Sequence, residues 1–162
     1  MVTSVGRIHK EVVLRAPIQR VWEAISDSEQ FGRWFGARFE GPFRAGTRVK
    51  GEIAKTEMDP EVASYQEPYA GQPFELLVER VDPPRHFAFR WHPGAEPDED
   101  ATDESMTLVT FDLEEVEEGT RLVIQETGFD GIEAERRAKV FEENRGGWEI
   151  QARLVRLYVE RP

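Results

Sequence analysis

The stretch from Glu133 to Val159 constrains the fold most, because apolar residues recur at helical spacing along its whole length. A helix of this length spans roughly 40 Å, which is enough to cross a small domain. Charged residues occupy the intervening positions, so the opposite face belongs in water. Burial of so long an apolar face requires a sheet. The apolar positions are Ala134, Ala138, Phe141, Trp148, Ala152, Val155 and Val159, flanked by Val140, Ile150, Leu154 and Leu157.

Two adjacent glycines, Gly146 and Gly147, lie in the middle of this helical pattern. Each costs a helix about 1 kcal/mol relative to alanine. They indicate either a kink or frayed joint, or a missing side chain beside Trp148 that leaves room for a ligand or for another backbone.

Composition and charge restrict the class of protein. The chain has 162 residues, 39% of them hydrophobic, which predicts one domain, 1–162, with a real core. There is no cysteine, which excludes disulfides and thiolate chemistry. The net charge of −11 argues against nucleic acid and anionic membranes as partners. No signal peptide or membrane-length apolar run is found, so we expect a cytoplasmic protein, a monomer or weak homodimer.

The first third of the chain predicts a strand followed by two short helices. Proline ends the strand at Ala16-Pro17, and apolar residues at helical spacing follow from Ile18 to Ile25. Asp27 or Ser28 can cap a second helical turn, which carries Phe31, Trp34 and Phe35.

From Gly41 onward the apolar period changes to two, which indicates strands joined by hairpins. Residues 55–72 are irregular and rich in proline, so we expect a long excursion there. Residues 93–103 form an acidic loop between strands. The predicted strands are Ile8–Leu14, Thr47–Ile53, Phe74–Val81, His86–His92, Ser105–Leu113 and Thr120–Thr127.

Successive hairpins need no crossover helices, so the sheet is expected to be antiparallel with the helices on one side. The predicted fold class is α+β, with a curved antiparallel sheet of six strands around a long C-terminal helix and two short helices. Such a sheet leaves a hollow between its concave face and the helix.

Seven short motifs, in this order, resemble one known family. They are Ala16-Pro-Ile-Gln-Arg-Val-Trp22 with Arg33-Trp-Phe35, Phe43-Arg-Ala-Gly46, Val81-Asp-Pro-Pro84 before Phe87-Ala-Phe-Arg-Trp91, Gly119-Thr-Arg-Leu122, Glu126-Thr-Gly-Phe129, and Gly147-Trp148 with Leu154 and Tyr158. The chain is similar over residues 8–159 to the homologues of the activator of heat-shock-protein-ninety ATPase. It looks like the stand-alone bacterial members that match the C-terminal domain of that activator.

The resemblance implies a helix-grip fold of the START-related (SRPBCC) superfamily, with a deep cavity between sheet and C-terminal helix. That superfamily uses its cavity mainly to hold apolar or amphipathic small molecules, but fold alone does not settle function. The 55–73 and 96–104 segments depart from the family core, and both are candidates for a rim over the cavity mouth.

Aromatic residues provide the candidate ligand-binding surface, because an apolar pocket with a few polar groups is the usual form of a ligand site. The alternative is that the same rings have only a structural role and fill the core. The candidates are Trp34, Phe35, Phe74, Phe89, Trp91, Phe141, Trp148 and Ala152.

Three polar residues are candidates to orient a ligand: Arg90, His92 and Glu126. Glu126 shares strand parity with Leu122 and Ile124, so its carboxylate points at the cavity if that face is concave. Arg90 and His92 are expected on one face of the neighbouring strand, where they pair with Glu126 or form an ordinary rim ion pair with Glu79. A buried carboxylate beside such a base suits acid–base work.

Metal and cofactor chemistry have little support in the sequence. His9, His86 and His92 are not at metal-ligand spacing, the acidic 96–104 segment lacks the pattern of a calcium loop, and no phosphate-binding loop is found. We therefore predict no cofactor and no metal.

Three hypotheses for function follow. The first is non-enzymatic binding of a small apolar or aromatic molecule under the C-terminal helix. The second is stimulation of the heat-shock-protein-ninety ATPase through contact with that chaperone, although the chain lacks the activator's separate N-terminal domain. The third is an enzyme of cyclase or hydrolase type that uses an inward Glu, Arg or His.

Overall fold

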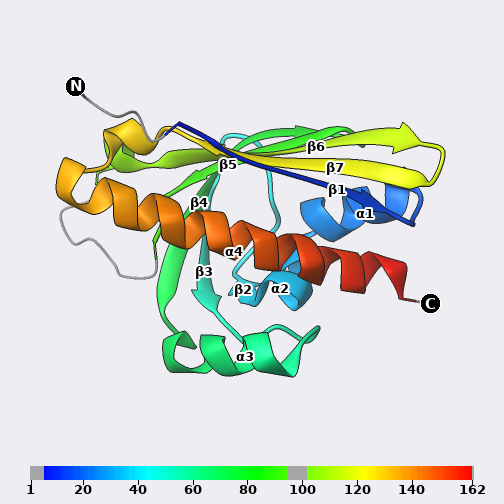
Figure 1. The fold of residues 1–162 in the computed structure, drawn as a ribbon, viewed down its shortest axis with the longest axis horizontal. Coiled ribbons are helices and arrows are strands. Elements are labelled where there is room, and N and C mark those ends of the chain that lie inside the picture. Colours follow the sequence, from blue (N-terminus) through cyan, green and yellow to red (C-terminus); the bar gives the residue numbers. More distant parts are fainter. Residues whose placement is uncertain (1–5, 95–101, 162) are drawn as a thin grey trace.

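The structure is a computed structural model, and it describes residues 6–94 and 102–161. Its seven-stranded antiparallel sheet has the order β1-β7-β6-β5-β4-β3-β2, so the first strand pairs with the last. The sheet and a long C-terminal helix form the helix-grip fold, which confirms the predicted fold class (Figure 1). The expected count of six strands was wrong, because the strand at residues 37–39 is too short to show a period in the sequence. The strands are β1 (Ile8–Leu14), β2 (Ala37–Phe39), β3 (Arg48–Ile53), β4 (Pro73–Asp82), β5 (His86–Trp91), β6 (Thr107–Val116) and β7 (Gly119–Thr127).

Helix α4 (Ala134–Glu160) crosses the molecule beneath the sheet (Figure 1). The stripe it buries is narrower than the sequence pattern: Ile150 and Leu157 are exposed, and so are Ala134 and Ala138. The wide stripe was therefore wrong at these positions, because only one line of side chains reaches the sheet. The residues that α4 buries are Val140, Trp148, Leu154, Val155, Tyr158 and Val159.

Helix α4 runs through Gly146 and Gly147 without a break, so the expectation of a frayed joint there was wrong. A Cβ atom built at either glycine meets no heavy atom within 4 Å. The glycines therefore make no close approach to another backbone, and neither of them lines the pocket described below.

Helices α1 (Ile18–Ser26) and α2 (Ser28–Phe35) form the predicted pair of short helices. The Asp27 carboxylate accepts hydrogen bonds from the first backbone N–H groups of α2, as an N-cap does. The indole of Trp34 is fully buried, and its Nε1 donates to the Ala24 carbonyl at 2.8 Å. This bond fixes the two helices against each other and places the end of α2 against the sheet.

The long excursion contains a helix that the sequence analysis missed, α3 (Pro60–Gln66). Asp59 is its N-cap, and hydrogen bonds from the backbone N–H groups of Val62 and Glu61 lower the pKa of the Asp59 carboxyl. Arg153 of α4 lies 3.0 Å from the same carboxylate and adds to the effect. The excursion is thereby attached to the long helix.

Three short 3₁₀ turns complete the elements: η1 (Glu67–Tyr69), η2 (Asp103–Ser105) and η3 (Phe129–Gly131). Of the acidic segment proposed as a rim, residues 96–101 lie outside the described part of the chain.

Aromatic rings fill most of the hollow between the sheet and the helices. Phe31 lies at the centre, within 6.4 Å of the ring centroids of Phe89 and Phe111. These three rings, and that of Phe87, are almost fully buried. The aromatic core therefore fills the hollow beside α1 and α2 in the described part of the chain.

The C-terminal end of α4 is held by α1. The guanidinium of Arg20 donates to the backbone carbonyls of Tyr158 and Val159, which have no partner within the helix. Within the described residues, none of the helices combines the length and apolar character needed to cross a membrane.

Candidate ligand-binding pocket

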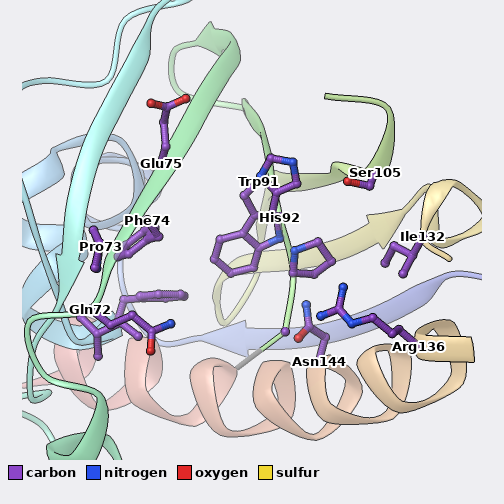
Figure 2. A pocket seen from close by; sticks show the side chains of 14 residues that line it. Gln72, Pro73, Phe74, Glu75, Trp91, His92, Ser105, Ile132, Arg136 and Asn144 are labelled. Carbon is purple, nitrogen blue, oxygen red and sulfur yellow. The ribbon is translucent and has the colours of Figure 1, made fainter. Parts of the chain in front are cut away.

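A pocket of about 340 Å³ opens between β4, the end of β5 and the first half of α4 (Figure 2). It lies at the end of the hollow that the core aromatic rings leave unfilled. Its lining residues are Phe35, Ile53, Gln72, Pro73, Phe74, Glu75, Trp91, His92, Pro93, Gly94, Ser105, Ile132, Arg136 and Asn144.

Three aromatic side chains from three elements form the apolar wall: Phe35 at the end of α2, Phe74 on β4 and Trp91 on β5. The rings of Phe35 and Trp91 are 6.0 Å apart. Trp91 reaches the pocket because strand alternation sends it to the concave face together with Phe89. These rings offer a ligand flat apolar surfaces on more than one side.

Glu126 lies directly behind this wall and is the one charged side chain that is fully buried in the described part of the chain. Its Oε2 accepts hydrogen bonds from Trp91 Nε1 at 2.8 Å and from Thr107 Oγ1 at 2.5 Å. Its Oε1 accepts from Asn144 Nδ2 at 2.8 Å and from Trp148 Nε1 at 2.9 Å. One carboxylate thus ties β5, β6 and α4 to β7.

Four neutral donors surround Glu126, and no Lys or Arg side chain is among them. Burial of a carboxylate is costly unless hydrogen bonds replace its water shell. Two bonds to each oxygen use both lone pairs of each, so the shell is complete without a cation. We conclude that Glu126 positions Trp91 and Asn144, the two partners that also line the pocket.

Arg90 and His92 do not meet Glu126. Arg90 alternates with the inward residues of β5, so it lies on the opposite face, where its Nε donates to Glu79 Oε1 at 2.6 Å. Of the two pairings expected for Arg90, the structure thus has the one with Glu79. His92 lines the pocket, and its Nε2 lies 2.7 Å from the Thr102 carbonyl oxygen.

The other predicted site residues divide between the pocket wall and the core. Phe35, Phe74 and Trp91 line the pocket, together with His92. The rest do not, because they pack inside the hollow or along α4. Trp34, Phe89 and Trp148 are buried, Phe141 packs on Phe129 with ring centroids 5.0 Å apart, and Ala152 is half-buried.

Sequence reasoning missed Asn144, Arg136, Ile132 and Gln72 as lining residues. A signal existed for Asn144, which lies four residues before Trp148 and therefore on the same face of the helix. Figure 2 shows Asn144 rising from α4 toward Trp91, with Arg136 eight residues earlier on the same helix.

The rim beside β4 carries an ion-pair network. Arg48 donates to Glu75, a lining residue, at 2.9 Å and to Asp103 of η2 at 2.5 Å. Hydrogen bonds to these two carboxylates raise the pKa of Arg48. The network joins β3, β4 and η2 at the pocket edge.

Within residues 6–94 and 102–161, no cluster of three or more His, Asp or Glu side chains is arranged to hold a metal ion. The described lining of the pocket offers apolar contact and a few hydrogen-bonding groups.

Solved structures share this architecture over nearly their whole length. A protein from Arthrobacter aurescens has a TM-score of 0.72 at 21% identity, with 99% of this chain and 90% of that chain covered. A protein from Bacillus halodurans has a TM-score of 0.65 at 27% identity, covering 95% and 96%. The Aha1 dimer from Colwellia psychrerythraea has a TM-score of 0.67 at 15% identity, covering 95% and 96%. These likenesses show that the chain has the helix-grip fold.

The family described as "Activator of Hsp90 ATPase homolog 1-like protein" matches residues 15–160. The chain belongs to this family, which confirms the resemblance found in its motifs. No curated protein sequence matches the chain significantly.

Proposed function

We propose that this protein binds a small apolar or aromatic molecule in the pocket between β4, β5 and α4. The observation that carries the proposal is the wall of Phe35, Phe74 and Trp91 around a volume of about 340 Å³. Pockets for small organic ligands begin near 300 Å³ and combine apolar walls with a few polar groups. The proposed ligand is therefore of the size of two or three fused rings.

Apolar burial is the main source of affinity in such a site. A ligand that buries roughly 200 Å² of apolar surface gains about 5 kcal/mol at 25 cal/mol per Å², before the costs of association. At about 5 kcal/mol the dissociation constant is about 0.2 mM, so we expect weak binding near the millimolar range unless polar contacts add to it.

The test is a titration with a panel of lipids, flavonoids and polyketides, followed by tryptophan fluorescence. Trp91 lines the pocket and Trp148 lies behind it, with ring centroids 5.8 Å apart, so a bound ligand changes the surroundings of both. Absence of any response across the panel, confirmed by calorimetry, contradicts the proposal.

Two variants localise the binding. Phe74→Ala removes roughly 50 Å² of contact and is expected to weaken binding about tenfold. Tyr65→Ala is the matched control, because Tyr65 is 70% exposed on α3 and does not line the pocket. Equal affinities of the two variants would place the ligand elsewhere.

Stimulation of the Hsp90 ATPase through protein contact is a second candidate. It is supported by the description of the family and by the naming of the Colwellia psychrerythraea neighbour as an Aha1 dimer. An ATPase assay with purified chaperone tests it. Stimulation that survives Phe74→Ala would show that this activity does not need the pocket.

The cyclase or hydrolase hypothesis has less support. Both oxygens of Glu126 are occupied by protein donors, and Arg90 lies on the outer face of the sheet. Neither residue faces a bound molecule. Of the three candidates His92 alone lines the pocket, and its Nε2 lies 2.7 Å from the Thr102 carbonyl oxygen.

A further inference from the structure

The orientation of the Asn144 side-chain amide is fixed by Glu126. A carboxylate surrounded by donors only accepts, so the atom of Asn144 that faces it at 2.8 Å is the amide nitrogen. The amide oxygen, Oδ1, is then directed away from Glu126. In Figure 2 the Asn144 amide stands at the pocket between α4 and the Trp91 side chain, beside Arg136.

Asn144 Oδ1 accepts no hydrogen bond from any residue in the described ranges 6–94 and 102–161. The neighbouring polar side chains differ from it in this respect. Ser105 donates to the Thr102 carbonyl, the His92 ring lies against the same carbonyl, and Glu75 is bound by Arg48. Among the described residues, Asn144 therefore presents an acceptor that no protein donor fills.

We propose that the pocket selects ligands that carry a hydroxyl or N–H group on their apolar frame, and that this group donates to Asn144 Oδ1. The inference rests on the proposed function, since it names the chemical class of the ligand for that pocket. It excludes purely hydrocarbon ligands as preferred partners.

The physical reason is the cost of an acceptor that is covered without a partner. A ligand with a donor replaces the water that it displaces from Oδ1, whereas a ligand without one leaves the oxygen unsatisfied. The Asn144 amide cannot exchange its oxygen for its nitrogen by rotation, because rotation would turn the oxygen toward the Glu126 carboxylate. A single hydrogen bond of this kind changes affinity about tenfold.

The test compares 2-naphthol with 2-methylnaphthalene, which have the same shape and differ in the donor. Calorimetry on the full chain gives the ratio of the two affinities. The ratio is then measured again on Asn144→Leu, which lacks the amide. We expect the ratio to favour 2-naphthol about tenfold more in the wild type than in the variant. Asn144→Ala is measured as a second variant in case leucine at this position impairs folding.

A spectroscopic measurement on the unaltered protein complements the variants. Asn144 is the one asparagine in the 162-residue sequence, so asparagine labelled with ¹³C and ¹⁵N gives a single side-chain amide. Its carbonyl ¹³C signal is expected to shift with 2-naphthol and not with 2-methylnaphthalene.

Equal ratios in wild type and variants, or an unchanged carbonyl signal at saturation with 2-naphthol, would overturn the selection by Asn144. Failure of both naphthalenes to bind would overturn it as well. These outcomes leave the proposed function standing if other members of the panel bind and Phe74→Ala weakens their binding. If no member of the panel binds, both the proposed function and the selection by Asn144 are wrong.

Discussion

Replacement of Glu126 by glutamine probes the most unusual group of the molecule, a buried carboxylate with four neutral donors. Each oxygen of Glu126 accepts from one indole, Oε1 from Trp148 and Oε2 from Trp91. The amide nitrogen of a glutamine therefore faces an indole N–H in either orientation. Thr107 and Asn144 can each turn to offer an acceptor, but an indole cannot. One buried N–H is left without a partner.

The expected cost follows from this count. An orphaned buried donor costs about 1–3 kcal/mol, and the remaining bonds lose their charge-assisted strength. Relief from burying a charge offsets part of the loss. We expect Glu126→Gln to lower the free energy of unfolding by about 2 kcal/mol, and Glu126→Leu, which orphans all four donors, to lower it by about 4 kcal/mol or more.

The assay is urea unfolding at neutral pH. With a slope near 2 kcal/mol per M, Glu126→Gln shifts the midpoint by about 1 M. Glu149→Gln is the matched control on α4, because the Glu149 side chain is 78% exposed, and its midpoint should stay within the equivalent of about 0.5 kcal/mol. A Glu126→Leu protein as stable as the wild type would refute the reasoning, since the donors would then not depend on the carboxylate.

Three further predictions concern stability. Gly146→Ala should raise the free energy of unfolding by about 0.5–1 kcal/mol, because its Cβ meets open space. Gly32→Ala should lower the free energy of unfolding, because its Cβ would lie 2.2 Å from the Ala37 carbonyl oxygen. Thermal unfolding of both variants tests this, and a lower midpoint for Gly146→Ala than for the wild type would contradict it. Trp34→Phe should cost about 2 kcal/mol in urea unfolding through the lost hydrogen bond and the lost volume, and an unchanged midpoint would contradict this. Because the folded-state pKa of Asp59 is lowered, its carboxylate stabilises the fold above the ordinary aspartate pKa of 3.8, and this contribution is lost as pH falls through the lowered value. The stability difference between wild type and Asp59→Asn should therefore shrink from neutral pH to about pH 3, and a constant difference would refute it.

The sequence predicted the fold well because the periodic signals were long. Six strands and the helices at 18–26, 28–35 and 134–160 carry apolar repeats that only one arrangement can bury. The misses were short. β2 has three residues, too few for a period, and α3 has seven, although Asp59 followed by Pro60 is a readable N-cap signal.

The candidate site was harder, because strand parity gives the face of a residue but not its neighbours. Parity correctly indicates an inward Glu126, and the same rule places Arg90 outside, opposite Phe89 and Trp91. What parity cannot give is which rings close the hollow. Phe89 and Trp148 fill it, while Trp91 is left at a wall, and that outcome depends on side-chain volumes summed over several elements.

The pairing of β1 with β7 has a consequence for the order of events during synthesis. β1 leaves the ribosome about a hundred residues before its partner strand, because every hydrogen bond that it makes in the sheet is to residues 120–126. Until those residues emerge, the apolar side of β1 has no strand beside it. We therefore expect the native sheet to close only after residues 120–126 have emerged, with the slow kinetics of long-range contacts and a period in which the nascent chain depends on protection from aggregation.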